Sequence, residues 1–233
     1  PDSAALSRGG QRPSGTGRAD GGDFGEARGA GLDAGSRFDR PVPRNGYAWW
    51  YVDGLSDDGR YGLTVIAFIG SVFSPYYARA RRSGDADPLD HCAFNVVLYS
   101  PRGKRWAMTE RDRRAISRSE THFQVGSSAM SFDGDALTLL IDETCVPFPF
   151  RLRGRIRVDA DILGTQSHRI DPEGRHLWRP VMPSARIAVE MSDPQLSWTG
   201  HGYFDHNRGS APLESDFVDW TWARFPLTDG SAI

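Results

Sequence analysis

Two pairs of polar and aromatic residues stand out near the C-terminal end of the chain: His176 with Trp178, and Tyr203 with Asp205. Within each pair the spacing is i, i+2, so in a β-strand both side chains lie on the same face of the sheet. Two facing strands would then gather a carboxyl group, an imidazole and two electron-rich rings. This combination of groups suits the formation and stabilisation of a carbocation.

Adding water to an unactivated carbon–carbon double bond requires a proton delivered to carbon and then capture of the cation. Burial in an apolar pocket would raise the pKa of Asp205, so that it stays protonated near neutral pH and acts as the acid. Trp178 and Tyr203 could stabilise the cation through their ring faces. His176 could orient Asp205 or take the proton from the attacking water. This scheme requires no cofactor and no metal.

Each of these residues also has a more ordinary interpretation. Trp178 and Tyr203 could be core or rim aromatics of a barrel, and Asp205 could simply start a turn. A metal site is a further alternative, because imidazole and carboxylate bind zinc and iron. Its ligands would be His176, His201, Asp205 and His206, but their spacing matches no strong metal-binding motif.

The segment 196–205 has one polar and one apolar face if it is a strand. Ser197, Thr199, His201, Tyr203 and Asp205 alternate with Leu196, Trp198, Gly200, Gly202 and Phe204. The polar row could face water or line a cavity, and the pattern alone leaves both possibilities open.

The rest of the chain predicts an all-β fold, an antiparallel barrel or sandwich, because short strand-like runs follow one another at hairpin spacing. Asp-Gly turns at Asp58-Gly59 and Asp133-Gly134 are strong hairpin signals. We expect strands at 47–52, 61–69, 91–99, 104–109, 129–132, 136–142, 148–158, 176–181, 185–191, 196–204 and 217–225. Between them, 71–90 is expected to be a polar loop.

The segment 148–158 has the clearest alternation. Phe148, Phe150, Leu152, Ile156 and Val158 are predicted to be buried on one face. The four arginines at 151, 153, 155 and 157 are predicted to lie in solvent or beside acids on the other.

Composition sets the broad class. The 233 residues carry a net charge of -2, which gives no sign of a nucleic-acid partner. Residues 1–40 are rich in glycine and poor in large apolar side chains, so we expect a disordered tail before a domain at 41–233. Cys92 and Cys145 lie in apolar runs and are predicted to be free, buried thiols. No stretch has the composition of a membrane-spanning helix or a signal peptide.

Long stretches of the chain resemble the carotenoid 1,2-hydratase (hydroxyneurosporene synthase) family of phototrophic bacteria. The matching motifs lie at 47–53, 62–77, 91–95, 105–111, 174–180, 202–207, 212–214 and 220–222. The resemblance implies a lipocalin-like fold and cofactor-free hydration of the terminal C1–C2 double bond of acyclic carotenoids such as neurosporene and lycopene. It implies His176, Trp178, Tyr203 and Asp205 as functional residues, with Asp205 the proton donor.

The resemblance also implies a second lipocalin-like domain, before which we expect this chain to stop. Because the implied substrate lives in membranes, we expect a bacterial cytoplasmic protein peripherally bound to the photosynthetic inner membrane, with the aromatic segment from Phe73 to Tyr77 as candidate contact. A non-catalytic carrier of hydrophobic ligands is the alternative function. Glu214 could be a second acid of the site or a surface residue, and the oligomeric state stays undetermined.

Overall fold

The computed structural model describes residues 37–227 and 230–232. The chain divides into two compact units, Pro1–Ala30 and Gly31–Ile233, and every described residue belongs to the second. The predicted tail therefore lies outside the described residues except for 37–40. In that short part Phe38 is fully buried and packs edge-on against Trp50, so ordered structure starts before the predicted boundary at residue 41.

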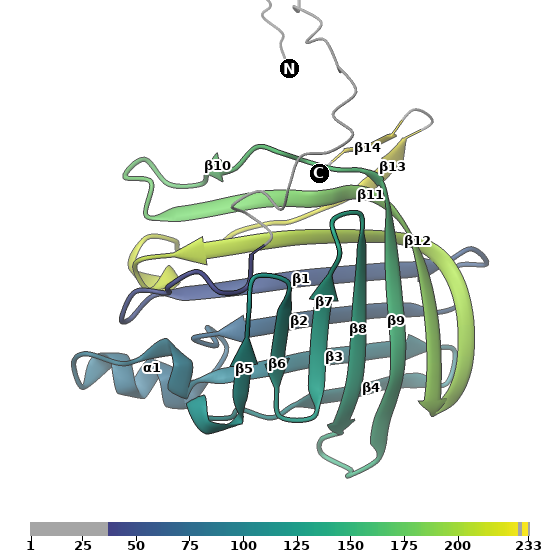
Figure 1. The fold of residues 1–233 in the computed structure, drawn as a ribbon, viewed down its shortest axis with the longest axis horizontal. Helices are drawn as coiled ribbons and strands as arrows, with labels where there is room; N and C mark the ends of the chain where they lie inside the picture. The colour runs from purple at the N-terminus through teal and green to yellow at the C-terminus, as the bar shows by residue number, and fades with distance from the viewer. Residues whose placement is uncertain (1–36, 228–229, 233) are drawn as a thin grey trace, which may run out of the picture. The chain divides into compact units, whose positions relative to one another are not determined.

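Antiparallel strands dominate the described chain, as predicted (Figure 1). They are β1 (Tyr47–Ser56), β2 (Gly62–Ile69), β3 (Cys92–Ser100), β4 (Gly103–Met108), β5 (Ile116–Arg118), β6 (His122–Val125), β7 (Ser128–Phe132), β8 (Ala136–Thr144), β9 (Arg151–Ile162), β10 (His168–Arg169), β11 (His176–Asp193), β12 (Gln195–Gly209), β13 (Phe225–Leu227) and β14 (Gly230–Ala232). The helical segments are α1 (Pro75–Arg82), η1 (Pro88–Asp90), η2 (Arg113–Ala115) and η3 (Leu213–Ser215).

One large sheet organises these strands in the order β4-β3-β2-β1-β12-β11-β9-β8-β7-β6-β5, with β10 added beside β11. Strands β5 to β9 run across β1 to β4, so the sheet curls over and its inner faces meet (Figure 1). The space between them is filled with apolar side chains such as Val65, Phe94, Phe123 and Ile156. The interior of this half-barrel is thus a packed core.

Strand β1 explains how a second buried surface arises. Its sequence Tyr-Ala-Trp-Trp-Tyr-Val has large apolar side chains on both faces, which is typical of a strand covered on both sides. Trp50 and Val52 point into the core, whereas Tyr47 and Trp49 join a separate apolar cluster on the outer face. Something must therefore cover the outer face of β1.

Most of the predicted hairpins are confirmed, and four local predictions are wrong. The runs 176–181 and 185–191, expected as two strands, form the single strand β11. The 71–90 loop contains α1, because Ser74 caps it by accepting hydrogen bonds from the backbone N–H groups of Tyr76 and Tyr77. Residues 217–224 form no strand. Phe148 and Phe150 are 67% and 56% exposed, because they lie in the turn before β9 instead of on its buried face.

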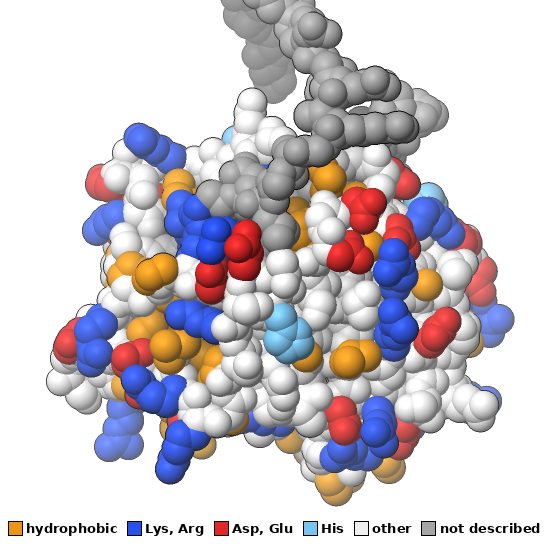
Figure 2. All heavy atoms as spheres, in the orientation of Figure 1, with side chains coloured by type: hydrophobic (Ala, Val, Ile, Leu, Met, Phe, Trp, Pro, Cys, Tyr) orange, Lys and Arg blue, Asp and Glu red, His pale blue; other side chains and the backbone are white. Residues whose placement is uncertain are grey.

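The predictions for the two cysteines and for the arginine row of β9 are confirmed. Cys92 and Cys145 are free and buried. The arginine row of β9 lies in solvent beside acids: Arg157 pairs with Asp159 at 2.7 Å and Arg151 pairs with Asp142. Basic and acidic side chains lie next to one another on the face shown in Figure 2, which bears no single-sign patch there.

Candidate active site

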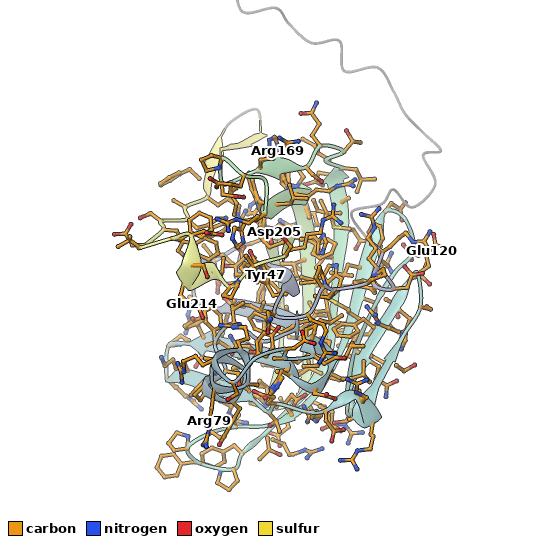
Figure 3. All side chains as sticks on the ribbon, turned by 90° about the vertical axis from the view of Figure 1, so that its left-hand side faces the viewer. Tyr47, Arg79, Glu120, Arg169, Asp205 and Glu214 are labelled. Carbon is orange, nitrogen blue, oxygen red and sulfur yellow. The ribbon has the colours of Figure 1, made fainter. Side chains whose placement is uncertain are left out.

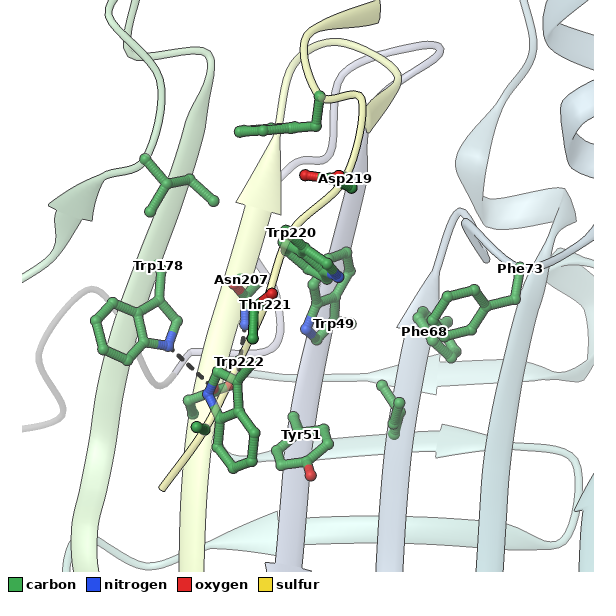
Figure 4. Close-up of a pocket in the computed structure, with 15 residues that line it drawn as sticks. Trp49, Tyr51, Phe68, Phe73, Trp178, Asn207, Asp219, Trp220, Thr221 and Trp222 are labelled. Carbon is green, nitrogen blue, oxygen red and sulfur yellow. Dashed lines mark hydrogen bonds between the residues drawn. The ribbon is translucent and has the colours of Figure 1, made fainter. Parts of the chain in front are cut away.

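Four neighbouring strands build an aromatic floor on the outer face of the sheet. The antiparallel register aligns outward-facing residues of β11, β12, β1 and β2 in two rows that run across the strands. One row is Trp178, Asn207, Trp49 and Phe68; the other is Pro180, Asp205, Tyr51 and Ile66. Figure 4 shows the labelled members of these rows side by side, with Trp178 at one end and Phe68 at the other.

The chain after β12 turns back and forms a roof over this floor. Phe217 packs against His176 at 5.0 Å between ring centroids, and Trp220 packs edge-on against Trp49 at 5.7 Å. Trp222 lies 5.3 Å from Tyr51. We call residues 211–224 the roof segment. Its rings thus provide the cover that the apolar side chains on the outer face of β1 require.

Ion pairs fix the two ends of the roof segment. Arg224 donates a hydrogen bond of 2.5 Å to Asp53 on β1, and both side chains are largely buried. At the other end Glu214 forms an ion pair of 2.6 Å with Arg81 of α1. Glu214 is 62% exposed and does not line the cavity, so its place is that of a surface acid.

A cavity of about 600 Å³ lies between floor and roof (Figure 4). Its lining is mostly aromatic, with a few polar groups among the rings, as in many sites for apolar ligands. The lining residues are Trp49, Tyr51, Ile66, Phe68, Phe73, Ile170, Trp178, Asp205, Asn207, Phe217, Asp219, Trp220, Thr221, Trp222 and Ala223. In Figure 3, Asp205 and Tyr47 lie on the side that carries Glu214, away from Glu120.

Asp205 is the buried carboxyl of this cavity. Its Oδ2 accepts a hydrogen bond of 2.9 Å from Trp178 Nε1 and one of 3.0 Å from the Tyr203 hydroxyl. Its Oδ1 accepts a bond of 2.8 Å from Asn207 Nδ2. A carboxylate has about four acceptor positions, so three donors leave one at which a proton can be held.

Burial raises the pKa of Asp205 to about 7, because the 3% exposed carboxylate has lost its hydration. The hydrogen bonds from Trp178, Tyr203 and Asn207 oppose this rise, and the negative charge of Asp53 adds to it. The group is therefore close to half protonated at neutral pH, which is the condition that favours general acid catalysis.

Tyr203 contributes to this site from below the cavity surface. It is fully buried and does not line the cavity, while its ring lies 5.5 Å from that of Trp222. Burial, with the nearby Asp205 charge, raises the pKa of its hydroxyl well above the ordinary value. Tyr203 therefore stays protonated and serves Asp205 as a hydrogen-bond donor.

The structure places His176 in a different cluster. Its Nε2 lies 2.6 Å from Asp216 Oδ2 and its Nδ1 lies 2.9 Å from the Tyr47 hydroxyl. In the register of β11 and β12, His176 is four residues from the position opposite Asp205, which is roughly 13 Å along the strand. The imidazole thus holds the roof segment through Asp216 and Phe217.

Gly209 makes this second cluster possible. A Cβ at this position would lie 2.4 Å from Tyr47 Cε1 and 2.7 Å from His176 Nδ1. Glycine lets these two rings meet over the end of β12.

Of the four residues selected from the sequence, the structure brings together Trp178, Tyr203 and Asp205 and sets His176 apart. The polar row of β12 is divided: Ser197, Thr199 and His201 are exposed, whereas Tyr203 and Asp205 are buried. His206 points to the opposite face and stacks on Trp50, and burial lowers its pKa to about 3. The alternative metal ligands therefore do not converge, and no cluster of three or more such groups occurs in the described part of the chain.

Sequence reasoning missed several members of the site. Asn207 could have been found, because it continues the i, i+2 series of Tyr203 and Asp205 along the same strand. Trp49, Tyr51 and Trp222 reach the site only through strand pairing and the return of the roof segment. No local spacing signals those contacts.

The chain is similar to known proteins in both sequence and fold. A family model described as carotenoid hydratase CrtC matches residues 65–233. The acyclic carotenoid 1,2-hydratase of Thiocapsa roseopersicina is 48% identical over 98% of this chain and 56% of that protein. The protein of the same description from Rubrivivax gelatinosus is 50% identical over 84% of this chain and 48% of that protein. The chain spans about half the length of these curated relatives.

Among solved structures, the Nitrosomonas europaea protein assigned as AttH has a TM-score of 0.51, with 17% identity, over 82% of this chain and 58% of that chain. At this identity the likeness shows the fold alone, which is lipocalin-like.

Proposed function

The chain belongs to the carotenoid hydratase family, and from that premise we propose that it adds water to the terminal C1–C2 double bond of an acyclic carotenoid such as neurosporene or lycopene. The reaction would be an acid-catalysed hydration that yields a tertiary alcohol and uses no cofactor.

One observation supports this proposal above all others: a carboxyl with a pKa of about 7 lies in the wall of an aromatic cavity. Asp205 would be the catalytic acid. In a carrier of apolar ligands a buried carboxyl would only add a desolvation cost, whereas an acid that protonates an alkene must be protonated at the working pH.

The proposed reaction has two steps. Asp205 donates its proton to C2, the π electrons form the new C–H bond, and a tertiary cation is left at C1. Water then attacks C1, and the proton that it loses returns to the Asp205 carboxylate. Atoms and charge balance, and the enzyme ends the cycle in its starting state.

The rings around Asp205 would stabilise the cation. Trp178, Tyr51 and Trp222 line the cavity beside the carboxyl. A cation over an aromatic face gains on the order of 0.5–2 kcal/mol for each well-placed ring, more when water is excluded. The Trp178 Nε1–H group also binds the carboxylate, which ties the position of this ring to that of the acid.

For His176 the proposed role is positioning. Its contacts with Asp216 and Phe217 hold the roof segment over the floor. Loss of the imidazole would therefore loosen the cavity and would leave the acid itself unchanged.

For the cellular setting, the proposal is peripheral binding to the bacterial inner membrane from the cytoplasmic side. Phe73, which lines the cavity, and Tyr76, in the first turn of α1, are 58% and 70% exposed, which suits contact with the polar surface of a bilayer. Tyr77 is fully buried and donates to the Gly46 carbonyl, so it is excluded from the contact surface. No helix in the described part of the chain is long and apolar enough to cross a membrane.

The proposal is tested by incubating the chain with lycopene in liposomes and labelled water. The parent should give a 1-hydroxy product that carries the label, and Asp205→Asn should give none while still binding lycopene. Asp57→Asn is the matched control, because Asp57 is an exposed carboxyl that pairs with Arg186 and does not line the cavity. It should keep the activity of the parent.

Three outcomes would contradict the proposal. Labelled product from Asp205→Asn would remove Asp205 as the acid. An isomer of unchanged mass would indicate a cyclase or isomerase. Binding of lycopene without conversion, by this chain and by the full-length relative alike, would indicate a carrier.

A further inference from the structure

We propose that the polyene enters the cavity by one end only, with its terminal double bond at the β11–β12 side and the rest of the chain leaving over β2 past Phe73. Phe73 would then determine specificity for long substrates. This inference rests on the proposed function and concerns the direction in which the substrate lies.

The length of the floor supports entry by one end. It crosses four strands, and neighbouring strands are about 4.8 Å apart, so it is roughly 14 Å long. An extended chain advances roughly 1.2 Å per bond, so the floor can hold about 12 bonds. The main chain of an acyclic carotenoid is more than twice as long, so most of it must lie outside the cavity.

The β11 end of the floor is bordered by β10 and the residue that follows it. Strand β10 pairs with β11 there, and the ring of His168 lies 5.4 Å from that of Trp178. Ile170, just beyond β10, lines the cavity, and its backbone N–H donates a hydrogen bond of 3.1 Å to the His176 carbonyl at the start of β11. On this side the lining of the cavity ends at Trp178 and Ile170.

The β2 end is open by comparison. The roof segment stacks on rings from β11, β12 and β1, namely His176, Tyr203, Trp49 and Tyr51. Over β2, the ring that packs on Phe68 is Phe73, at 5.4 Å, and Phe73 itself is 58% exposed. Figure 4 shows Phe73 at the edge of the cavity farthest from Trp178.

The position of Asp205 fixes the direction. It is one strand from the β11 end and two strands from Phe68, so the floor between Asp205 and Trp178 has room only for the end of a chain. The carbon that takes the proton is the second of the chain, which must lie beside Asp205. The terminal carbon and its methyl groups then fill the space under Trp178, and the polyene extends toward Phe73.

The inference is tested by comparing kcat/KM for lycopene with kcat/KM for a short acyclic isoprenoid, which has the same terminal double bond and a main chain of about 12 bonds. Phe73→Ser should lower the ratio of kcat/KM for lycopene to kcat/KM for the short isoprenoid about fivefold, because the ring contacts only the part of the polyene beyond the floor. Quenching of tryptophan fluorescence by the polyene should show the same selective loss of binding.

Phe150→Ser is the matched control, since Phe150 is 56% exposed on the turn before β9 and does not line the cavity. Its ratio should equal that of the parent. An unchanged ratio in Phe73→Ser would overturn the inference, whether both substrates are affected equally or neither is affected. Hydration by the parent with loss in Asp205→Asn would still support the proposed function in that case, so the two failures are distinguishable.

Discussion

Replacing Asp205 by asparagine should make the folded chain progressively more stable, relative to the parent, as the pH rises from 4 to 7. The carboxyl has an ordinary pKa of 3.8 and a pKa of about 7 in the folded protein. Well below pH 3.8 it is protonated in both states. Between the two values the unfolded chain gives up the proton and the folded chain keeps it, so the free energy of unfolding of the parent falls.

The size of the effect follows from the two pKa values. Each unit between them corresponds to about 1.4 kcal/mol, so the full fall is about 4 kcal/mol, of which about 3 kcal/mol lies above pH 5. Asparagine cannot ionise, so the free energy of unfolding of the variant does not fall in this way. Its amide can keep the bond from Trp178, and Asn207 can turn so that its oxygen faces the new NH₂ group.

The assay is urea unfolding of both proteins, followed by tryptophan fluorescence, at half-unit steps from pH 5 to pH 8. Other titrating groups are common to both chains and largely cancel in the difference. Asp57→Asn is again the control: the ion pair with Arg186 holds the pKa of Asp57 at about 2, so its difference from the parent should be flat over this range. If the difference in free energy of unfolding between Asp205→Asn and the parent also stays constant with pH, the assignment of Asp205 as a buried, neutral acid is refuted.

Three further outcomes are expected. Hydration by the parent should decline above pH 7 as Asp205 loses its proton, and Asp53→Asn should move this decline to lower pH in rate–pH profiles, because the charge of Asp53 helps to raise the pKa of Asp205. Gly209→Ala should cost about 1–3 kcal/mol in urea unfolding, because its Cβ would meet the Tyr47 ring at 2.4 Å. Phe38→Ala should cost about 3–5 kcal/mol in the same assay, since the ring is fully buried in the core; no loss would show that this segment is dispensable.

Much of the fold was predictable because strand signals are local. Alternating side chains and Asp-Gly turns depend on neighbours in the chain, and they located most of the hairpins. Helix α1 was missed, although its signal is local too: a serine cap before a proline at the first helical turn. Phe148 and Phe150 were misplaced because periodicity does not show where a turn ends and a strand begins.

For the candidate site, the sequence by itself determined the chemical groups: the i, i+2 spacing put Tyr203 and Asp205 on one face of one strand and His176 and Trp178 on one face of another. Tertiary structure alone decided that this face is the outer one, that the half-barrel interior is filled, and that the roof segment returns to cover Asp205 with Trp222. It also decided that His176 binds Asp216 and Tyr47, roughly 13 Å along the strand from the acid. The physical reason is that the hydration and the charge of a side chain such as Asp205 depend on which side chains lie next to it across the sheet. Strand register and the path of a returning segment set those neighbours, and neither can be read from local sequence.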